Sequence, residues 1–168
     1  MRVLGVDPGI ATTGFAVLDR GGSAPVPVAI GTLRTAARLP HAQRLADLAG
    51  GFREVIAEHR PEVVAAERVF FSVNVRTAMA VGQASGVILA AAAAAGIPVF
   101  DYTPTEVKLS VAGVGTAPKQ QVASMVAALL RLDAPPQPAD AADACALAIC
   151  HLNRSGLARA LAAQGASG

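Results

Sequence analysis

The first 35 residues consist of short apolar runs separated by turn residues, a pattern typical of β-strands joined by tight connections. Three runs are expected as strands, at 2–7, 12–19 and 25–35. The sequence DRGG at 19–22 supplies the turn between the second strand and the third. Such short connections predict that the three strands form an antiparallel meander.

The spacing of apolar residues changes to a helical period after this meander. Between residues 39 and 61, Leu45, Leu48, Phe52 and Val55 fall on one face of a helix. Polar residues occupy the positions between them, so the segment is predicted to be amphipathic and to cover one face of the sheet.

The rest of the chain alternates strand-like and helix-like segments. Two further strands are expected at 62–67 and 97–102, and four further helices at 73–96, 103–113, 118–132 and 139–156. The sequence TPTE predicts a capping box at the start of the helix 103–113. This order predicts an α/β fold with a mixed five-stranded sheet flanked by helices. We expect one domain over 1–156 and a flexible C-terminal tail over 157–168.

Composition narrows the class of protein. The chain has 168 residues, of which 53% are hydrophobic and 15% charged, and this excludes a disordered protein. The net charge of +2 permits nucleic-acid binding without arguing for it. We expect no membrane association, because the apolar stretches lack the continuous strong hydrophobes of a membrane span. No signal-peptide pattern precedes the first strand, and Cys145 and Cys150 are expected to be reduced core thiols, so a cytoplasmic location is predicted.

Lysine is rare and clustered. The chain has only two lysines, Lys108 and Lys119, and they flank the glycine-containing stretch VAGVG at 111–115. Arginine bias in the composition explains their scarcity, and chance explains their closeness about as well as a shared role does.

Four carboxylates stand at positions that need an explanation. Asp7 and Glu67 end apolar strands, and Asp140 and Asp143 open the last helix. Each has an ordinary structural interpretation: Asp7 as a turn residue, Asp140 as an N-cap, and Asp143 as a partner of the helix dipole. The interpretation is weakest for Glu67, because glutamate is a poor strand residue.

Convergence of these acids would create a site for a metal ion. An unpaired buried carboxylate costs several kcal/mol or becomes protonated, and no basic residue in these segments is placed to pair with it. Carboxylate oxygens without His or Cys suit Mg²⁺ or Mn²⁺ better than Zn²⁺. Two such ions can act together in phosphoryl transfer. The residues alone therefore indicate a possible carboxylate metal site.

Four sequence blocks resemble RuvC-type Holliday junction resolvases. They are VLGVDPGIATTGFAV, AAERVFFSVNVRTAMAVGQASGV, GVGTAPKQQVASMV and PADAADACALAI, in that order from about residue 1 to residue 152. The resemblance implies a ribonuclease H-like fold and a homodimer that binds a four-way DNA junction. It also implies paired, metal-dependent nicks in strands of like polarity during recombination and repair, with 5′-phosphate and 3′-hydroxyl ends.

The resemblance assigns roles to individual residues of this chain. It implies that two divalent cations per subunit, Mg²⁺ or Mn²⁺, are held by four catalytic acids: Asp7, Glu67, Asp140 and Asp143. It further implies DNA contacts from four residues: Lys108, Lys119, Arg76 and the junction-facing aromatic Phe70. Lys119 is also implied to take part in catalysis. A RuvAB-type branch-migration complex is an expected partner.

Three other classes of protein compete with this interpretation: an ATP-binding module of the actin-like or P-loop kind, an RNA-processing nuclease, and a junction-binding protein without catalysis. The sequence DPGIATTG resembles the phosphate turn of actin-like and Hsp70-like ATPases, but these need two such domains and 168 residues are too few. GIATTGFA lacks the Lys and Ser/Thr of a P-loop. A YqgF-type RNA-processing nuclease fits the GVGTAPK and ADAAD stretches less well. A junction-binding protein without catalysis would bind DNA better without the four acids, because carboxylates repel phosphate. The presence of all four acids therefore argues against it.

Overall fold

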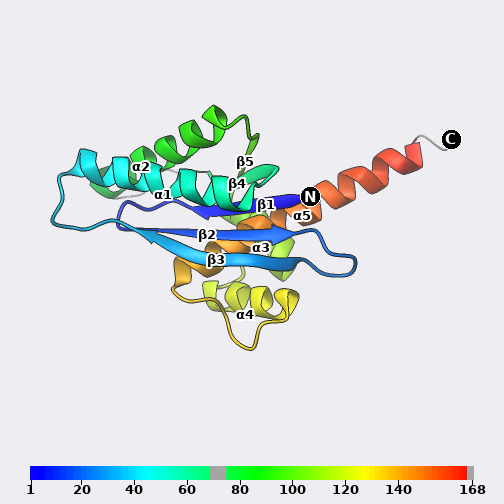
Figure 1. Ribbon diagram of the computed structural model, residues 1–168. Coiled ribbons are helices and arrows are strands. Elements are labelled where there is room, and N and C mark those ends of the chain that lie inside the picture. The colour runs from blue at the N-terminus through cyan, green and yellow to red at the C-terminus, as the bar shows by residue number, and fades with distance from the viewer. Residues whose placement is uncertain (69–74, 166–168) are drawn as a thin grey trace.

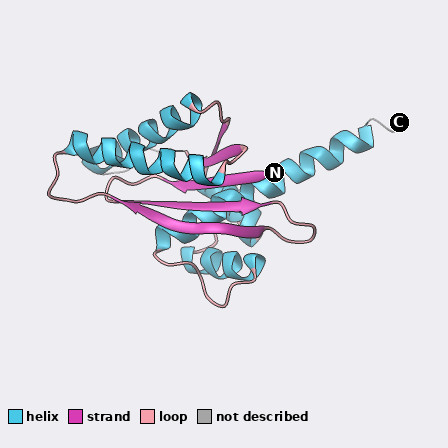
Figure 2. Ribbon diagram, in the orientation of Figure 1, coloured by secondary structure: helices cyan, strands magenta, loops and turns pink. Residues whose placement is uncertain are grey.

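The computed structural model describes residues 1–68 and 75–165, and the side chains within 1–68 and 78–157 (Figure 1). A mixed sheet runs through the middle of the molecule (Figure 2). Its strands are β1 (Arg2–Asp7), β2 (Thr12–Asp19), β3 (Val26–Arg34), β4 (Val63–Glu67) and β5 (Val99–Tyr102), in the spatial order β3-β2-β1-β4-β5. The strands β1, β2 and β3 pair antiparallel, as predicted, and β4 and β5 extend the sheet in parallel.

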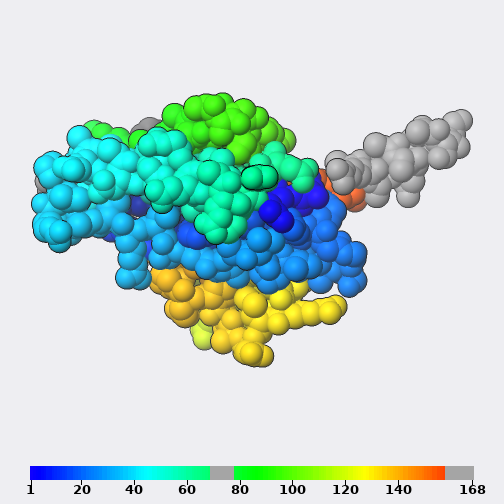
Figure 3. Space-filling model, viewed as in Figure 1, coloured from blue at the N-terminus to red at the C-terminus, as the bar shows by residue number. Residues whose placement is uncertain are grey.

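Helices cover both faces of this sheet. They are α1 (His41–His59), α2 (Val75–Ala94), α3 (Pro104–Ala112), α4 (Lys119–Leu130) and α5 (Ala139–Gly165). α1 and α2 lie together on one face, and α3, α4 and α5 lie on the other (Figures 1 and 3). The predicted fold class is therefore confirmed.

A hydrophobic cluster on each face holds the layers together. On one face Leu4 and Val6 of β1 belong to the same buried cluster as Phe52 of α1 and Ile88 of α2. Val3 points to the other face and joins the cluster that contains the first half of α5. All five side chains are fully buried. Because both faces of the central strands are covered, residues 3–6 of β1 and 63–66 of β4 are all apolar instead of alternating with polar residues.

The last helix is longer than the sequence indicated. α5 continues to Gly165, so the predicted end at residue 156 is wrong. The stretch LARALAA that follows Gly156 contains strong helix formers and no proline, and nothing in it stops the helix. The flexibility expected for 157–168 stays a prediction.

Two smaller expectations concern the cysteines and the membrane. Cys145 and Cys150 are free and buried, as expected for core thiols. Within the described part of the chain, no helix combines the length and the apolar content needed to cross a membrane.

Candidate active site

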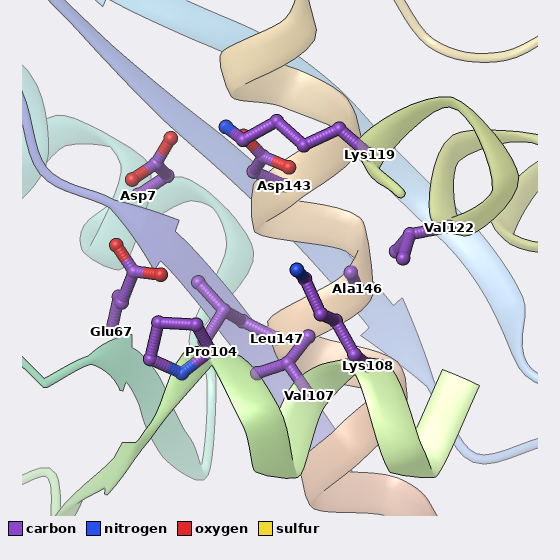
Figure 4. Close-up of a pocket in the computed structure, with 10 residues that line it drawn as sticks. All are labelled: Asp7, Glu67, Pro104, Val107, Lys108, Lys119, Val122, Asp143, Ala146 and Leu147. Carbon is purple, nitrogen blue, oxygen red and sulfur yellow. The ribbon is translucent and has the colours of Figure 1, made fainter. Parts of the chain in front are cut away.

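A small pocket opens where the carboxyl ends of β1 and β4 meet the first turns of α4 and α5 (Figure 4). Its volume is about 90 Å³. Three carboxylates and two lysines line it: Asp7, Glu67, Asp143, Lys108 and Lys119. Figure 4 shows the carboxylates of Asp7 and Glu67 and the ammonium group of Lys108 directed toward the same opening. Three of the four predicted acids and both predicted lysines therefore share one pocket.

The sheet places the first two acids side by side. β1 and β4 are parallel neighbours, with Val6 opposite Ala66 in the register, and each strand ends one residue later on its acid. Adjacent strands lie about 4.8 Å apart, so Asp7 and Glu67 emerge together at the carboxyl edge of the sheet. In α/β folds, ligands usually bind just beyond the carboxyl ends of the strands, and this edge of the sheet is therefore a typical place for a site.

Two glycines allow α5 to bring its acids to this edge. A Cβ atom on Gly5 would lie 2.1 Å from the carbonyl oxygen of Ala144, and one on Gly14 would lie 1.9 Å from that of Asp140. Any other residue at these positions would push α5 away from β1 and β2. The sequence analysis missed this role, although a glycine inside a strand is a signal of close backbone approach.

The loop after Asp7 is closed by a buried threonine. The hydroxyl group of Thr13 donates a hydrogen bond to the carbonyl oxygen of Gly9 at 2.7 Å and accepts one from the Gly9 amide at 3.2 Å. Thr13 is fully buried. These bonds fix the chain as it leaves Asp7 and hold that carboxylate at the pocket.

Lys119 forms an ion pair with Asp143. Its Nζ atom donates to Asp143 Oδ2 at 2.8 Å, and the lysine side chain is 80% exposed. The hydrogen bond to Asp143 is the main reason that the pKa of Lys119 lies above its ordinary value. The expectation that the acids lack a basic partner is therefore wrong for Asp143. The partner comes from the neighbouring helix α4, and local sequence does not show how α4 packs.

Asp7 and Glu67 are held in an environment that opposes their ionisation. Burial raises the pKa of Asp7 to about 7, and the charges of Asp143, Glu67 and Asp140 contribute to the shift, whereas Lys119 offsets part of it. Burial and the charge of Asp143 also raise the pKa of Glu67. The pocket therefore contains more negative charge than its lysines balance, and it favours the arrival of a cation.

The donor chemistry fits a hard divalent cation. The acids offer only oxygen atoms, which Mg²⁺ and Mn²⁺ prefer. Among the described residues, no three His, Cys, Asp or Glu side chains lie close enough together to enclose one ion. To hold one ion together, the carboxylates would have to turn toward it, and Asp143 would have to loosen its bond with Lys119. Asp140 does not line the pocket, although its charge acts on Asp7.

Two predicted DNA contacts cannot be placed relative to this pocket. Phe70 lies outside the described residues. Arg76 belongs to α2, but its side chain also lies outside the described part of the structure. Lys108, by contrast, extends from α3 into the pocket beside Val107.

The comparisons with known proteins identify the family. A family model of the crossover junction endodeoxyribonuclease RuvC matches residues 3–151. The chain belongs to this family. A RuvC from Rhodococcus jostii (strain RHA1) is 54% identical over 156 residues, which cover 92% of this chain and 82% of the relative.

Solved RuvC structures share the fold. RuvC of Thermus thermophilus superposes with a TM-score of 0.87 at 36% identity, covering 94% of this chain and 97% of the Thermus chain. The same protein in complex with a Holliday junction substrate gives a TM-score of 0.85 at 34% identity, covering 94% and 96%. The RuvC resemblance and the ribonuclease H-like fold that it implies are thus confirmed. RuvC membership favours the resolvase interpretation over an actin-like ATPase or a YqgF-type nuclease.

Proposed function

We propose that this chain is a structure-specific endodeoxyribonuclease that resolves four-way DNA junctions. It nicks two strands of like polarity by hydrolysis and leaves 5′-phosphate and 3′-hydroxyl ends that a ligase can seal. The observation that carries the proposal is the meeting of Asp7, Glu67 and Asp143 with Lys108 and Lys119 in one pocket of a RuvC fold. Metal-dependent phosphodiester hydrolysis needs acidic groups that bind the cations and basic groups that bind the phosphate.

The four acids are proposed to hold two divalent cations, Mg²⁺ or Mn²⁺, in each subunit. Asp7 and Glu67 act from the sheet edge, and Asp140 and Asp143 act from the first turns of α5. When bound, the cations activate water and stabilise the leaving oxygen. The raised pKa of Asp7 supports this assignment, because burying like charges together is unfavourable until a cation neutralises them.

The two lysines are proposed to bind the phosphate backbone at the cut. Lys119 neutralises the negative charge that develops on the phosphate during hydrolysis, and Lys108 positions the strand from the opposite side of the pocket. For Lys119 this requires an exchange of partners, in which a phosphate oxygen replaces Asp143 as the acceptor. Its high exposure leaves the ammonium group accessible for that exchange.

The proposed assembly is a homodimer that acts in the cytoplasm on recombination and repair intermediates. Part of α2 is a suitable dimer contact, because Ala78, Gly82 and Gly86 form a stripe of small residues along it. Phe70 is proposed to stack on a base at the junction, with Arg76 as a further DNA contact. A RuvAB-type branch-migration complex is the proposed partner that delivers the junction.

A single comparison tests the proposal. A labelled synthetic four-way junction and a linear duplex of the same sequence are incubated with the wild type and with Asp7→Asn, in Mg²⁺, in Mn²⁺ and in EDTA. We expect paired, ligatable nicks in the junction alone, dependent on metal and lost in a variant that still binds. Junction binding without nicks under every metal would reduce the chain to a binding module. Equal nicking of the linear duplex would contradict structure specificity.

A further inference from the structure

The loop that follows Asp7 is also held from outside. Residues 8–11 form this loop and join β1 to β2. Because β1, β2 and β3 pair antiparallel, the loop lies at the same edge of the sheet as the end of β3. Thr35, the first residue after β3, donates from its amide to the carbonyl oxygen of Ala11 at 3.3 Å and from its hydroxyl group to that of Ile10. The loop is thus fastened to the end of β3.

An arginine of α1 completes this contact. Arg44 donates from Nε to Thr35 Oγ1 at 2.9 Å and from a terminal nitrogen to the carbonyl oxygen of Ile10 at 3.3 Å. Arg44 is half-buried, and its planar guanidinium group reaches both acceptors at once, which the single ammonium group of a lysine does not match. Arg44, Thr35 and the carbonyl oxygen of Ile10 therefore form one network, the Arg44 clamp, that joins α1, the end of β3 and the loop after Asp7.

The clamp does not act through the charge of the arginine. Among the described residues, no carboxylate lies within ion-pair distance of Arg44, and both of its acceptors are neutral. Burial and three neighbouring acids raise the pKa of Asp7 and Lys119 lowers it, whereas Arg44 is not among the groups that act on it. What Arg44 contributes is a pair of donors in fixed directions.

The chain has little slack between the clamp and the carboxylate of Asp7. Only two residues, Pro8 and Gly9, separate that acid from Ile10. Proline restricts its own φ angle. A Cβ atom on Gly9 would lie 2.3 Å from the carbonyl oxygen of Thr12, so the turn is tight. A displacement of Ile10 is therefore passed to Asp7 across two constrained residues.

We propose that Arg44 and Thr35 are positioning residues, which orient the Asp7 carboxylate for the cation and for the scissile phosphate. Neither residue lines the pocket, and both act through the backbone of the loop. Removing an outer group that orients a metal ligand typically costs about 10–100-fold in metal affinity or activity. The inference rests on the proposed nuclease function and deepens it by assigning two residues that lie outside the pocket.

The experiment removes the bonds of the clamp with little change of shape. Thr35→Val deletes the hydroxyl group that links Arg44 to Ile10, whereas Thr35→Ser keeps a hydroxyl group there. Arg44→Met removes the donors of α1, and its control, Arg53→Met, removes an exposed charge from the same helix. Val55→Ala, at a buried position of α1, lowers stability by a route that leaves the clamp intact.

The first readout is the Mn²⁺ affinity of the free protein, measured by electron paramagnetic resonance without DNA. We expect Thr35→Val and Arg44→Met to bind Mn²⁺ at least about tenfold more weakly than the wild type. Thr35→Ser and the two controls should stay within about twofold of the wild type. Urea denaturation gives the stability of each variant. An equal loss of affinity in Val55→Ala would show that lowered stability causes the effect and would overturn the inference.

The second readout is single-turnover nicking of a four-way junction at saturating protein. We expect each clamp variant to be slower by on the order of 10–100-fold, while the affinity for the junction changes less than about threefold. Because both residues hold one carbonyl oxygen, the double variant should be within about twofold of the slower single variant. Losses that multiply in the double variant would contradict a shared clamp. Equal losses of nicking and of junction binding would indicate a DNA contact and would also overturn the inference.

Failure of the nuclease proposal looks different, since the wild type would then nick no junction. The Mn²⁺ titration still decides the inference in that case. A selective loss of affinity in Thr35→Val and Arg44→Met, restored in Thr35→Ser, supports the clamp. Unchanged affinity in both variants, or a wild type that binds no Mn²⁺, overturns it.

Discussion

Gly14 of β2 lies so close to the first turn of α5 that an added Cβ atom would be 1.9 Å from the carbonyl oxygen of Asp140. The backbone of β2 therefore sets how near α5 comes to the sheet. Asp140 belongs to that turn, and Asp143 follows it in the next turn of the same helix. The distance of both acids from Asp7 therefore depends on the absence of a side chain at position 14. The relationship connects a strand glycine, with no chemistry of its own, to the placement of the proposed catalytic acids.

Replacing Gly14 with alanine should separate catalysis from DNA binding. The added methyl group must displace α5, and a shift of about 1 Å in reacting groups can cost on the order of 100-fold in rate. We expect single-turnover nicking of a four-way junction to fall by about that factor, while the affinity for the junction changes less than about threefold. Overpacking should also lower the free energy of unfolding by about 1–3 kcal/mol, measured by urea denaturation.

The matched control is Gly50→Ala in α1. Nothing lies within 4 Å of an added Cβ atom there, and alanine is the better helix former, so stability should rise by about 0.5–1 kcal/mol with nicking unchanged. Wild-type nicking by Gly14→Ala would show that α5 is not placed by this contact.

Local features of the fold could be predicted from the sequence because neighbouring residues determine them. The capping box of α3 is an example: Thr103 Oγ1 accepts a hydrogen bond from the Glu106 amide at 3.2 Å, and the Glu106 carboxylate accepts one from the Thr103 amide at 2.9 Å. The two residues are three apart, so the pattern TPTE contains the whole interaction. The carboxyl-edge positions of Asp7 and Glu67 followed similarly from where their apolar runs end.

Other parts of the site depend on packing between distant segments and left weaker signals. The bond between Lys119 and Asp143 joins two helices, and no periodicity in either helix reports it. The close approach at Gly14 likewise depends on which helix lies over β2. Family resemblance had selected both Lys119 and Asp143, but only the packing of α4 against α5 shows them as partners.

Asp7 should destabilise the protein at neutral and alkaline pH. Its pKa is about 7 in the folded protein against an ordinary value of 3.8, so the folded state holds the proton more tightly than the unfolded state does. The contribution of this group to the free energy of unfolding is therefore present at low pH and is lost as the pH rises from about 4 to 7. Asp7→Asn removes that loss.

At pH 8 we expect Asp7→Asn to have a higher free energy of unfolding than the wild type. The difference between the two proteins should exceed the difference at pH 4 by on the order of 2 kcal/mol. Urea denaturation at the two pH values without divalent cations measures the difference. The exposed residue Asp47 of α1 provides a control, because Asp47→Asn should change stability by less than about 0.5 kcal/mol at both values. A stability gain for Asp7→Asn that does not depend on pH would contradict the raised pKa.

Cation binding should release protons below neutral pH. The carboxylate of Asp7 must lose its proton to coordinate an ion, and its pKa of about 7 means that much of it is protonated at pH 6. Apparent Mn²⁺ affinity should therefore rise with pH and level off above about 7. Calorimetric titration in buffers of different ionisation enthalpy counts the protons, and we expect more to be released at pH 6 than at pH 8. Equal release at both values would argue against Asp7 as a ligand.

Lys119 should oppose cation binding in the free protein and support catalysis on the junction. Its ammonium group holds Asp143 Oδ2 at 2.8 Å, so a cation must compete for that oxygen. Lys119→Met should therefore bind Mn²⁺ more tightly without DNA, yet nick junctions on the order of 100-fold more slowly, because no ammonium group then meets the phosphate. Lys108→Met removes the same charge from the same pocket without freeing Asp143, so its gain in Mn²⁺ affinity should be smaller. Equal gains in Mn²⁺ affinity in the two variants would mean that the gain comes from the change in net charge alone. Equal losses of nicking and of junction binding in Lys119→Met would contradict a catalytic role for Lys119.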